Sequence, residues 1–274
     1  MGNLIKADLK RIRRDKMMII ITILAVVFAL ITPLLYAALL SGTDTEGMEF
    51  MLGSINAKSS FFGSFSIGNN LGLIVPVLLA IILRKDFSQG TIRNKIIAGK
   101  SRTQIFLAMF VACAVTLIVV MLFHAFITLG ISLLLFEYQA TPFTISDYWY
   151  FMASLGFDLL LLLFVAAFIS WLCASMKNVG AVIVLYIAFV FGLSIISVIT
   201  STVQMVFEFQ DGKESAVEIL EIVNRINIAN ATNYIGTGTS YSLTDVLYIT
   251  LPPLAGIAGF LGLSLLKFKK RDLK

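Results

Sequence analysis

The run QIFLAMFVACAVTLIVVMLFHAFITLGISLLLF, from Gln104 to Phe136, contains no Asp, Glu, Lys or Arg. About 20 consecutive apolar residues are enough for a helix to cross a bilayer, so this run predicts a membrane-spanning helix that tilts or extends beyond the bilayer. The whole chain agrees, because 58% of its 274 residues are hydrophobic and only 14% are charged. Soluble domains have about 25% charged residues. The sequence therefore predicts an integral membrane protein.

Five further apolar runs accompany this one, and they predict an all-α polytopic membrane protein with six transmembrane helices. We place the spans at about 17–40, 67–83, 104–136, 150–175, 179–204 and 246–266. The first run is longer than the 7–15-residue core of a signal peptide, so we expect it to be retained. No connection is long enough to bury a core of its own, so residues 1–274 are expected to form a single transmembrane domain.

The last predicted span carries a series of small residues. These are Ala255, Gly256, Ala258, Gly259 and Gly262. Small side chains let two helices approach closely within a membrane, so the series predicts close packing of this span against a neighbour.

The segment 1–16 precedes the first span and has an amphipathic pattern. Ile5, Leu9 and Ile12 share one helical face, and Lys and Arg surround the rest. This pattern predicts an interfacial helix on the membrane surface. The alternative is a solvated basic tail that only sets the topology.

The distribution of basic residues predicts the orientation. Of the 21 Lys and Arg, 18 lie on one side of the predicted membrane, and only Lys58, Lys213 and Arg225 lie on the other. The positive-inside rule then places both termini, the 84–103 loop and the 176–178 turn in the cytoplasm, with the protein in the plasma membrane. Topology also explains the net charge of +5, so a nucleic-acid partner is not expected.

The longest external connection, residues 205–245, contains an amphipathic pattern. Ala216, Leu220, Val223 and Ile226 form one helical stripe, with charged residues opposite. We expect an external amphipathic or re-entrant helix that lies on or dips into the outer membrane boundary before the last span.

The charged stretch RKDFSQGTIRNKIIAGKSR, residues 84–102, separates two apolar runs. Ile92, Ile96 and Ile97 recur at helical spacing, with Ser88 as a candidate start and Gly99 as a candidate end. So short a helix is marginal in water by itself, and an apolar stripe on it indicates docking. The spacing alone leaves open whether it docks on the membrane surface or on a partner protein.

Two ionisable residues lie inside predicted spans, His124 and Asp158. Such groups are costly in a bilayer and are therefore functional candidates. The two spans are consecutive, so a contact between these side chains is geometrically possible. Ser194, Ser197 and Ser201 form a polar stripe with Gln204 in the next span. These residues predict either a hydrated, proton-sensitive translocation path or hydrogen bonds that hold the helices together.

Catalytic signatures are missing from the sequence. It contains no G-x-x-x-x-G-K-[ST] phosphate-binding loop and no H-E-x-x-H, and its single histidine does not allow a histidine metal cluster within one subunit. Cys113 and Cys173 lie in apolar runs and are interpreted as small hydrophobic residues. We therefore expect a non-enzymatic chain without its own cofactor or metal. If ATP drives its work, another polypeptide must bind the nucleotide.

The pattern after the second predicted span resembles the ABC-2 class of ABC transporter permeases. The residues that carry the resemblance are Asp86, the segment Gly90-Thr91-Ile92-Arg93 and the pair Ser101-Arg102. The basic N-terminal helix and six spans are also similar to that class. Asp86 stands where such permeases more often have Glu, which keeps the carboxylate but shortens its reach.

The resemblance implies a half-transporter powered by a separate ATPase that binds ATP and Mg. Its 84–103 loop would contain a cytoplasmic coupling helix, and the 176–178 turn would form a second contact. The implied ATPase-coupling residues are Asp86, Gly90, Thr91, Ile92, Arg93, Ile96, Ile97, Lys177 and Asn178. The implied partners are two copies of an ABC ATPase subunit, a second identical or different permease subunit, and membrane lipid.

The leading hypothesis is a permease subunit of an ATP-driven exporter. Its substrate would be hydrophobic or amphipathic, such as an antimicrobial peptide, a drug or a lipid-like molecule. One alternative is a proton-coupled secondary transporter that uses His124 and Asp158. The other is a membrane sensor or assembly subunit that transports nothing.

Overall fold

The computed structural model describes residues 1–41, 56–139, 142–210, 212–236 and 240–270. Helices make up its secondary structure, and the described residues contain no strand. Five of the helices are long and apolar enough to cross a membrane: α2 (Lys16–Ser41), α7 (Arg102–Leu135), α8 (Ile145–Ser175), α9 (Val179–Glu208) and α12 (Leu243–Lys270). The prediction of a polytopic α-helical membrane protein is confirmed.

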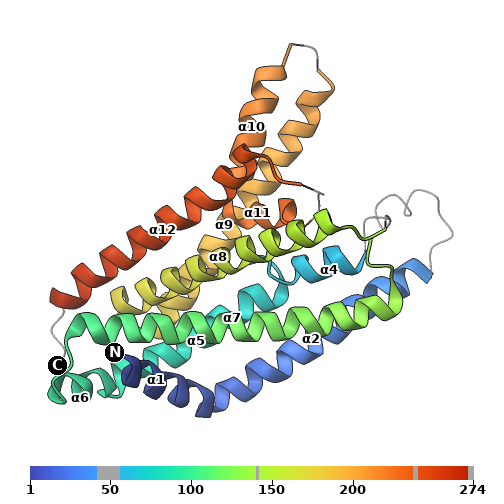
Figure 1. The fold of residues 1–274 in the computed structure, drawn as a ribbon. Coiled ribbons are helices and arrows are strands. Elements are labelled where there is room, and N and C mark those ends of the chain that lie inside the picture. Colours follow the sequence, from blue (N-terminus) through green and yellow to red (C-terminus); the bar gives the residue numbers. More distant parts are fainter. Residues whose placement is uncertain (42–55, 140–141, 211, 237–239, 271–274) are drawn as a thin grey trace.

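Shorter helices complete the fold (Figure 1). These are α1 (Gly2–Arg14), α4 (Ala57–Gly63), α5 (Asn70–Ser88), α6 (Thr91–Ile97), α10 (Glu214–Ile226) and α11 (Ile228–Tyr234). The helix α5, predicted as the second span, is not among the five, because every stretch of it that is long enough includes Arg84, Lys85 and Asp86. It follows α4, and both helices pack against α7.

Several helices extend beyond the apolar runs that predicted them. α8 begins at Ile145 instead of 150, because Thr144 and Asp147 form a capping box in which the Thr144 N–H donates to Asp147 Oδ2 at 2.8 Å. α5 begins at Asn70 instead of 67 and continues to Ser88, so it includes the start of the predicted 84–103 loop. Apolarity gives the part of a helix that lipid covers, whereas caps and tertiary contacts set its ends.

The predicted external loop 205–245 is also mostly helical. α9 continues to Glu208, and α10 and α11 follow before α12 begins at Leu243. α9 and α10 pack against each other as a hairpin that projects at the end of the molecule opposite α1 and α6 (Figure 1).

The helices α7 and α8 form the centre of the bundle, and α2, α9 and α12 lie at its periphery. Large apolar side chains are therefore exposed on the outer helices, among them Ile23, Phe191, Ile199 and Leu263. In a soluble protein such a surface would be unfavourable, but lipid tails are as apolar as these side chains. The surface is what a bundle surrounded by lipid requires.

Only one glycine of the small-residue series makes the close approach that we predicted. A Cβ on Gly256 would lie 2.3 Å from Cε2 of Phe164, so α12 contacts α8 closely at this position. A Cβ on Gly259 or Gly262 would meet no atom within 4 Å. The series was the right signal, but the sequence did not tell which member faces the neighbouring helix.

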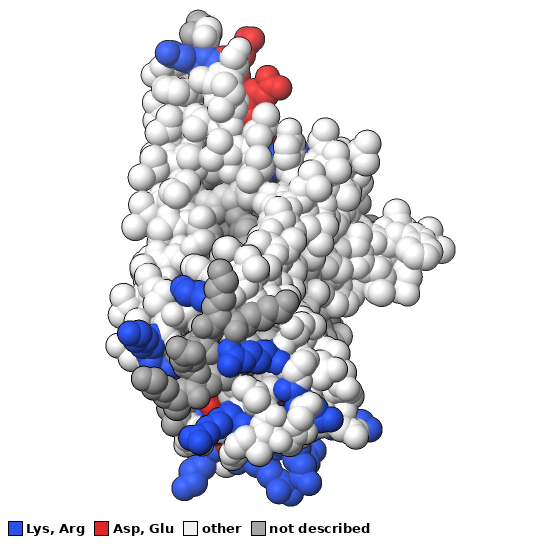
Figure 2. Space-filling view, turned by 90° about the vertical axis from the view of Figure 1, so that its left-hand side faces the viewer, with Lys and Arg blue, Asp and Glu red and all other residues white. Residues whose placement is uncertain are grey.

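Charged side chains are concentrated toward the two ends of the molecule. Figure 2 shows Lys and Arg gathered toward the end that carries α1 and α6, few charges in the middle, and a second small charged group at the opposite end. We call the first of these the basic end. The start of α1 and the end of α12 lie there in Figure 1, and the Arg102 guanidinium donates to the carbonyl of Phe268, near the end of α12, at 3.4 Å.

Candidate functional site

The helix α1 is fastened to the bundle at the basic end by ion pairs. Three ion pairs join it and the residue after it to the 85–95 segment: Arg11 to Asp86 (2.6 Å), Asp15 to Lys85 (2.7 Å) and Asp8 to Lys95 (2.5 Å). We call these six residues the ion-pair layer. Asp8, Arg11 and Asp15 recur at three- and four-residue steps, which places them on one face of the chain. Ile12 is buried beside them, so apolar contact and charge hold α1 in the same place.

Asp86 is the most buried carboxylate of the ion-pair layer, with 1% of its surface exposed. Burial raises the pKa of Asp86 to about 6, even though the nearby Arg11 and Lys95 favour the charged form. The residue that we predicted to contact an ATPase is therefore turned inward, toward Arg11. It positions α1 relative to the α5–α6 segment.

Arg84 connects the two segments that the resemblance had identified as separate contacts. Its side chain is buried and donates to the carbonyl of Cys173 at 3.1 Å and to that of Lys177 at 2.5 Å. The end of α5 is thereby tied to the end of α8 and to the α8–α9 turn. Sequence reasoning counted Arg84 only as a topology signal. Its position as the first basic residue after an apolar run, where it cannot reach water easily, was the available clue.

Asn178 has a local structural role in the same turn. Its Oδ1 accepts the Ala181 N–H at 2.7 Å and so caps the first turn of α9. Lys177 supplies the carbonyl that Arg84 binds. The turn is therefore fixed from both sides.

The helix α6 begins at Thr91, not at Ser88, because Gly90 adopts a left-handed conformation with φ of 70° that separates it from α5. Gly99, with φ of 77°, ends the segment as predicted. These two glycines fix the direction of a helix only seven residues long.

The three isoleucines of the predicted docking stripe of α6 do not all face outward. Ile92 is 2% exposed and Ile96 packs partly against the core, whereas Ile97 is 74% exposed. The reason is that α6 lies on the bundle of its own chain, which covers the inner part of the stripe. Arg93, Asn94 and Ile97 form the outward surface that remains available to a partner.

His124 and Asp158 have different surroundings. Nδ1 of His124 lies 2.9 Å from the carbonyl oxygen of Ala25, so the imidazole faces α2. Asp158 is fully buried in α8, and neither carboxylate oxygen has a hydrogen-bond partner within the described part of the chain. The possible contact between these two side chains is not formed, because His124 hydrogen-bonds to α2 and not to α8.

The serines of the predicted polar stripe of α9 have different surroundings. Ser194 donates to the Val190 carbonyl of its own helix at 3.0 Å, Ser197 is partly buried, and Ser201 is exposed. The face of α9 that contains Thr200 and Gln204, the last residue of that stripe, has partners on another helix. This face is directed to α10.

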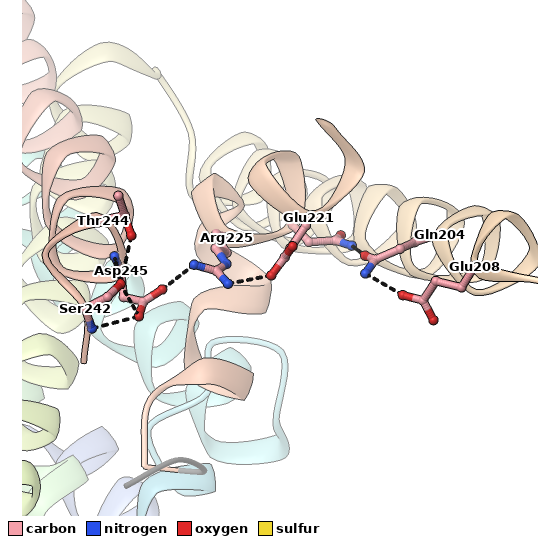
Figure 3. A network of polar contacts seen from close by, with 8 residues as sticks. Gln204, Glu208, Glu221, Arg225, Ser242, Thr244 and Asp245 are labelled. Carbon is pink, nitrogen blue, oxygen red and sulfur yellow. Dashed lines mark hydrogen bonds and ion pairs between the residues drawn. The ribbon is translucent and has the colours of Figure 1, made fainter. Parts of the chain in front are cut away.

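Polar side chains between α9, α10 and α12 form a network that the sequence had not indicated (Figure 3). The buried Asn224 accepts a hydrogen bond from Thr200 and donates to Gln204 Oε1 at 3.0 Å. Gln204 in turn donates to Glu208 at 3.0 Å. This network turns Asn224 toward α9, whereas Val223 and Ile226 of the predicted apolar stripe are exposed.

Arg225 extends the polar contacts from α10 to α12. It forms ion pairs with Glu221 of its own helix and with Asp245 in the first turn of α12 (Figure 3). The helix α10 is therefore anchored to two of the long helices, α9 and α12. Asn224 lies one helical turn after Leu220 among apolar residues, and this amide was the signal that could have revealed the contact with α9.

Among the described residues, no three His, Cys, Asp or Glu side chains lie together as they would to hold a metal ion. Cys113 and Cys173 are both buried and both free. What the structure brings together is the ion-pair layer, the α6 segment and the α8–α9 turn at one end.

Five lipid-length helices with an ordered charged layer at one end define a polytopic α-helical membrane protein. The chain belongs to the family described as "Protein of unknown function (DUF2705)", whose model matches residues 17–274. The match begins after α1. A search of the curated proteins found no match.

Proposed function

We propose that this chain is the permease subunit of an ATP-driven exporter of the ABC-2 class, and that a separate ATPase docks on the outward surface of α6. The observation that supports this proposal most is that the helices at the basic end are joined to one another by polar contacts. α1, α5, α6 and the α8–α9 turn are linked by the ion-pair layer and by Arg84, and α1 and α6 also pack against α7. A force applied to α6 would therefore reach both central helices. A helix that only rested on lipid would not need these links.

The orientation in this proposal has the basic end in the cytoplasm of a cell bounded by its plasma membrane. The excess of Lys and Arg at this end supports that orientation. ATP and Mg would bind the partner, since the sequence lacks a phosphate-binding loop. The α9–α10 hairpin would then lie outside the cell.

The sixth membrane crossing in this proposal is the divided segment α4–α5. Both parts pack against α7, and α4 buries Phe61 and Phe62. A crossing can be discontinuous where its polar backbone is covered by protein. The working unit would contain two such permeases, alike or different, and two ATPase subunits, with a hydrophobic or amphipathic substrate.

Purification from the native membrane in a mild detergent tests the proposal. We expect an ATPase to copurify with the wild-type chain and its ATP hydrolysis to be inhibited by vanadate. The double variant Arg93→Glu/Ile97→Asp should lose the ATPase, because it reverses the charge and polarity of the exposed α6 surface without touching buried Ile92. Ile219→Asp, at the exposed surface of the opposite hairpin, is the matched control and should retain the ATPase.

Two results would contradict the proposal. One is a wild-type chain that carries no ATPase from any preparation in which it remains folded. The other is equal recovery of the ATPase with the α6 double variant and with the control, which would move the docking surface away from α6.

A further inference from the structure

A cavity of about 360 Å³ lies where α4 and α5 meet, between these helices and α2 and α7. Phe28 and Tyr36 contribute apolar and aromatic wall from α2, and Leu71 does so from α5. Its polar wall comes from hydroxyl, amide and imidazole side chains. The polar residues that matter here are Ser60, Asn69, Asn70, His124 and Thr128.

The turn between α4 and α5 forms part of this wall and is held in place by close contacts. The Asn69 side chain donates to the carbonyl of Gly63 at 2.5 Å, which holds the turn closed. A Cβ on Gly72 would lie 2.0 Å from the Ser66 carbonyl oxygen, so the turn folds directly over the first turn of α5. No side chain caps the start of α5 within the described residues, and its first residues, Asn70 and Leu71, line the cavity. The beginning of a helix offers unpaired N–H donors.

His124 supplies an acceptor to the same space. Its Nδ1 faces the Ala25 carbonyl, which can only accept, so in the neutral imidazole Nδ1 carries the proton and Nε2 carries a lone pair. His124 lines the cavity, and Nε2 is its remaining polar atom.

Two hydroxyl groups of the wall have no partner in the described structure. Thr128 Oγ1 and Ser60 Oγ are both buried and make no hydrogen bond. Thr128 is 2% exposed, and it lies one helical turn from His124 on α7. Buried hydroxyls usually have a partner, and water or a ligand in the cavity would supply one to these two.

The described wall has no Asp, Glu, Lys or Arg. A charged group placed there would lose its hydration without a counter-charge, which is costly in a membrane. A hydroxyl or primary amide can instead donate to His124 Nε2 and accept from Thr128 or from the start of α5. We propose that this cavity binds the uncharged, hydroxyl- or amide-bearing head group of an amphipathic ligand.

If the ligand is the transported substrate, this proposal rests on the proposed exporter function. Binding itself needs no ATPase. The site can therefore be tested on the purified chain, and its result is separate from the copurification experiment.

Native mass spectrometry of the purified full chain, titrated with decanoylglycerol, tests the site. Decyl phosphate and decyltrimethylammonium have alkyl chains of the same length but charged head groups. We expect decanoylglycerol to bind more tightly than either. Thr128→Val and Ser60→Ala should each weaken its binding about fivefold, as expected for one lost hydrogen bond. Neither change removes a hydrogen bond among the described residues, because neither hydroxyl has a partner there.

Thr116→Val is the matched control. Thr116 is buried on the same helix, but its hydroxyl donates to the Ala112 carbonyl at 2.7 Å, and it does not line the cavity. This variant should bind decanoylglycerol as the wild type does. The proposal is overturned if decanoylglycerol does not bind, if a charged probe binds more tightly, or if Thr128→Val and Thr116→Val bind alike. If binding depends on Thr128 but no ATPase copurifies, the site stands and the exporter proposal fails.

Discussion

At the scale of single residues, a few buried charged side chains determine how the basic end is arranged. Arg84 satisfies two carbonyl groups at a helix end and a turn, and Asp86 receives Arg11. Helix ends carry carbonyl groups without partners, and a buried guanidinium has several donors to offer them. These residues therefore position the helices near the proposed ATPase surface instead of meeting the partner themselves.

The titration of Asp86 gives a prediction for pH. Its pKa is about 6 in the folded chain, because burial disfavours the charged form, whereas an unfolded Asp has a pKa of about 3.9. Between these values the folded chain binds more protons, so this group adds stability as the pH falls from 7 toward 4. We expect the wild type to gain on the order of 1–2 kcal/mol relative to Asp86→Asn over this range.

Thermal unfolding in detergent at a series of pH values measures this difference. The Asp86→Asn variant is the internal reference, since all other groups titrate in both proteins. A difference between the two proteins that does not change from pH 7 to pH 4, or that favours the variant more at low pH, would show that Arg11 outweighs burial at this position.

At the scale of elements, the contact between α8 and α12 is set by one glycine. Gly256→Ala places a methyl group within 2.3 Å of the Phe164 ring, so the helices must separate or the ring must move. Overpacking of this kind costs about 1–3 kcal/mol. We expect a lower melting temperature in detergent for Gly256→Ala.

Gly259→Ala, on the same helix, provides the comparison. Its added Cβ meets open space, and alanine is favoured over glycine inside a helix, so this variant should melt at or above the wild-type temperature. If both variants melt at the same temperature, the α8–α12 interface tolerates a methyl group and the close approach does not determine its stability.

The helices themselves could largely be predicted, whereas the contacts of their polar faces could not. Long apolar runs place α2, α7, α8, α9 and α12 directly, because lipid imposes the same requirement on each residue of a span. Asn224, His124 and Ile92 have partners far away in the sequence. Helical spacing shows that residues share a face, but it does not show which helix lies opposite that face.

At the scale of the whole molecule, the separation of charges gives a prediction about orientation. Lys6 lies exposed on α1 at the basic end, and Lys213 lies exposed near the tip of the α9–α10 hairpin. A membrane-impermeant maleimide should label Lys213→Cys in intact cells and Lys6→Cys only after permeabilisation, because the positive-inside rule places the basic end in the cytoplasm.

The wild-type chain is the control for this experiment. Its two cysteines, Cys113 and Cys173, are fully buried and should stay unlabelled. Labelling of Lys6→Cys in intact cells would reverse the orientation. It would also remove the outward surface of α6 from a cytoplasmic ATPase.

The sequence by itself determined that this protein is a helical bundle in a membrane and that its basic residues collect at one end. Both follow from composition and from the order of apolar runs, because transfer into lipid depends on each segment separately. Only the tertiary structure decided that Ile92 faces inward, that Arg84 joins α5 to the α8–α9 turn, and that α4 and α5 meet beside a polar cavity. These features depend on which side chains meet across helices, and that is fixed by packing in three dimensions.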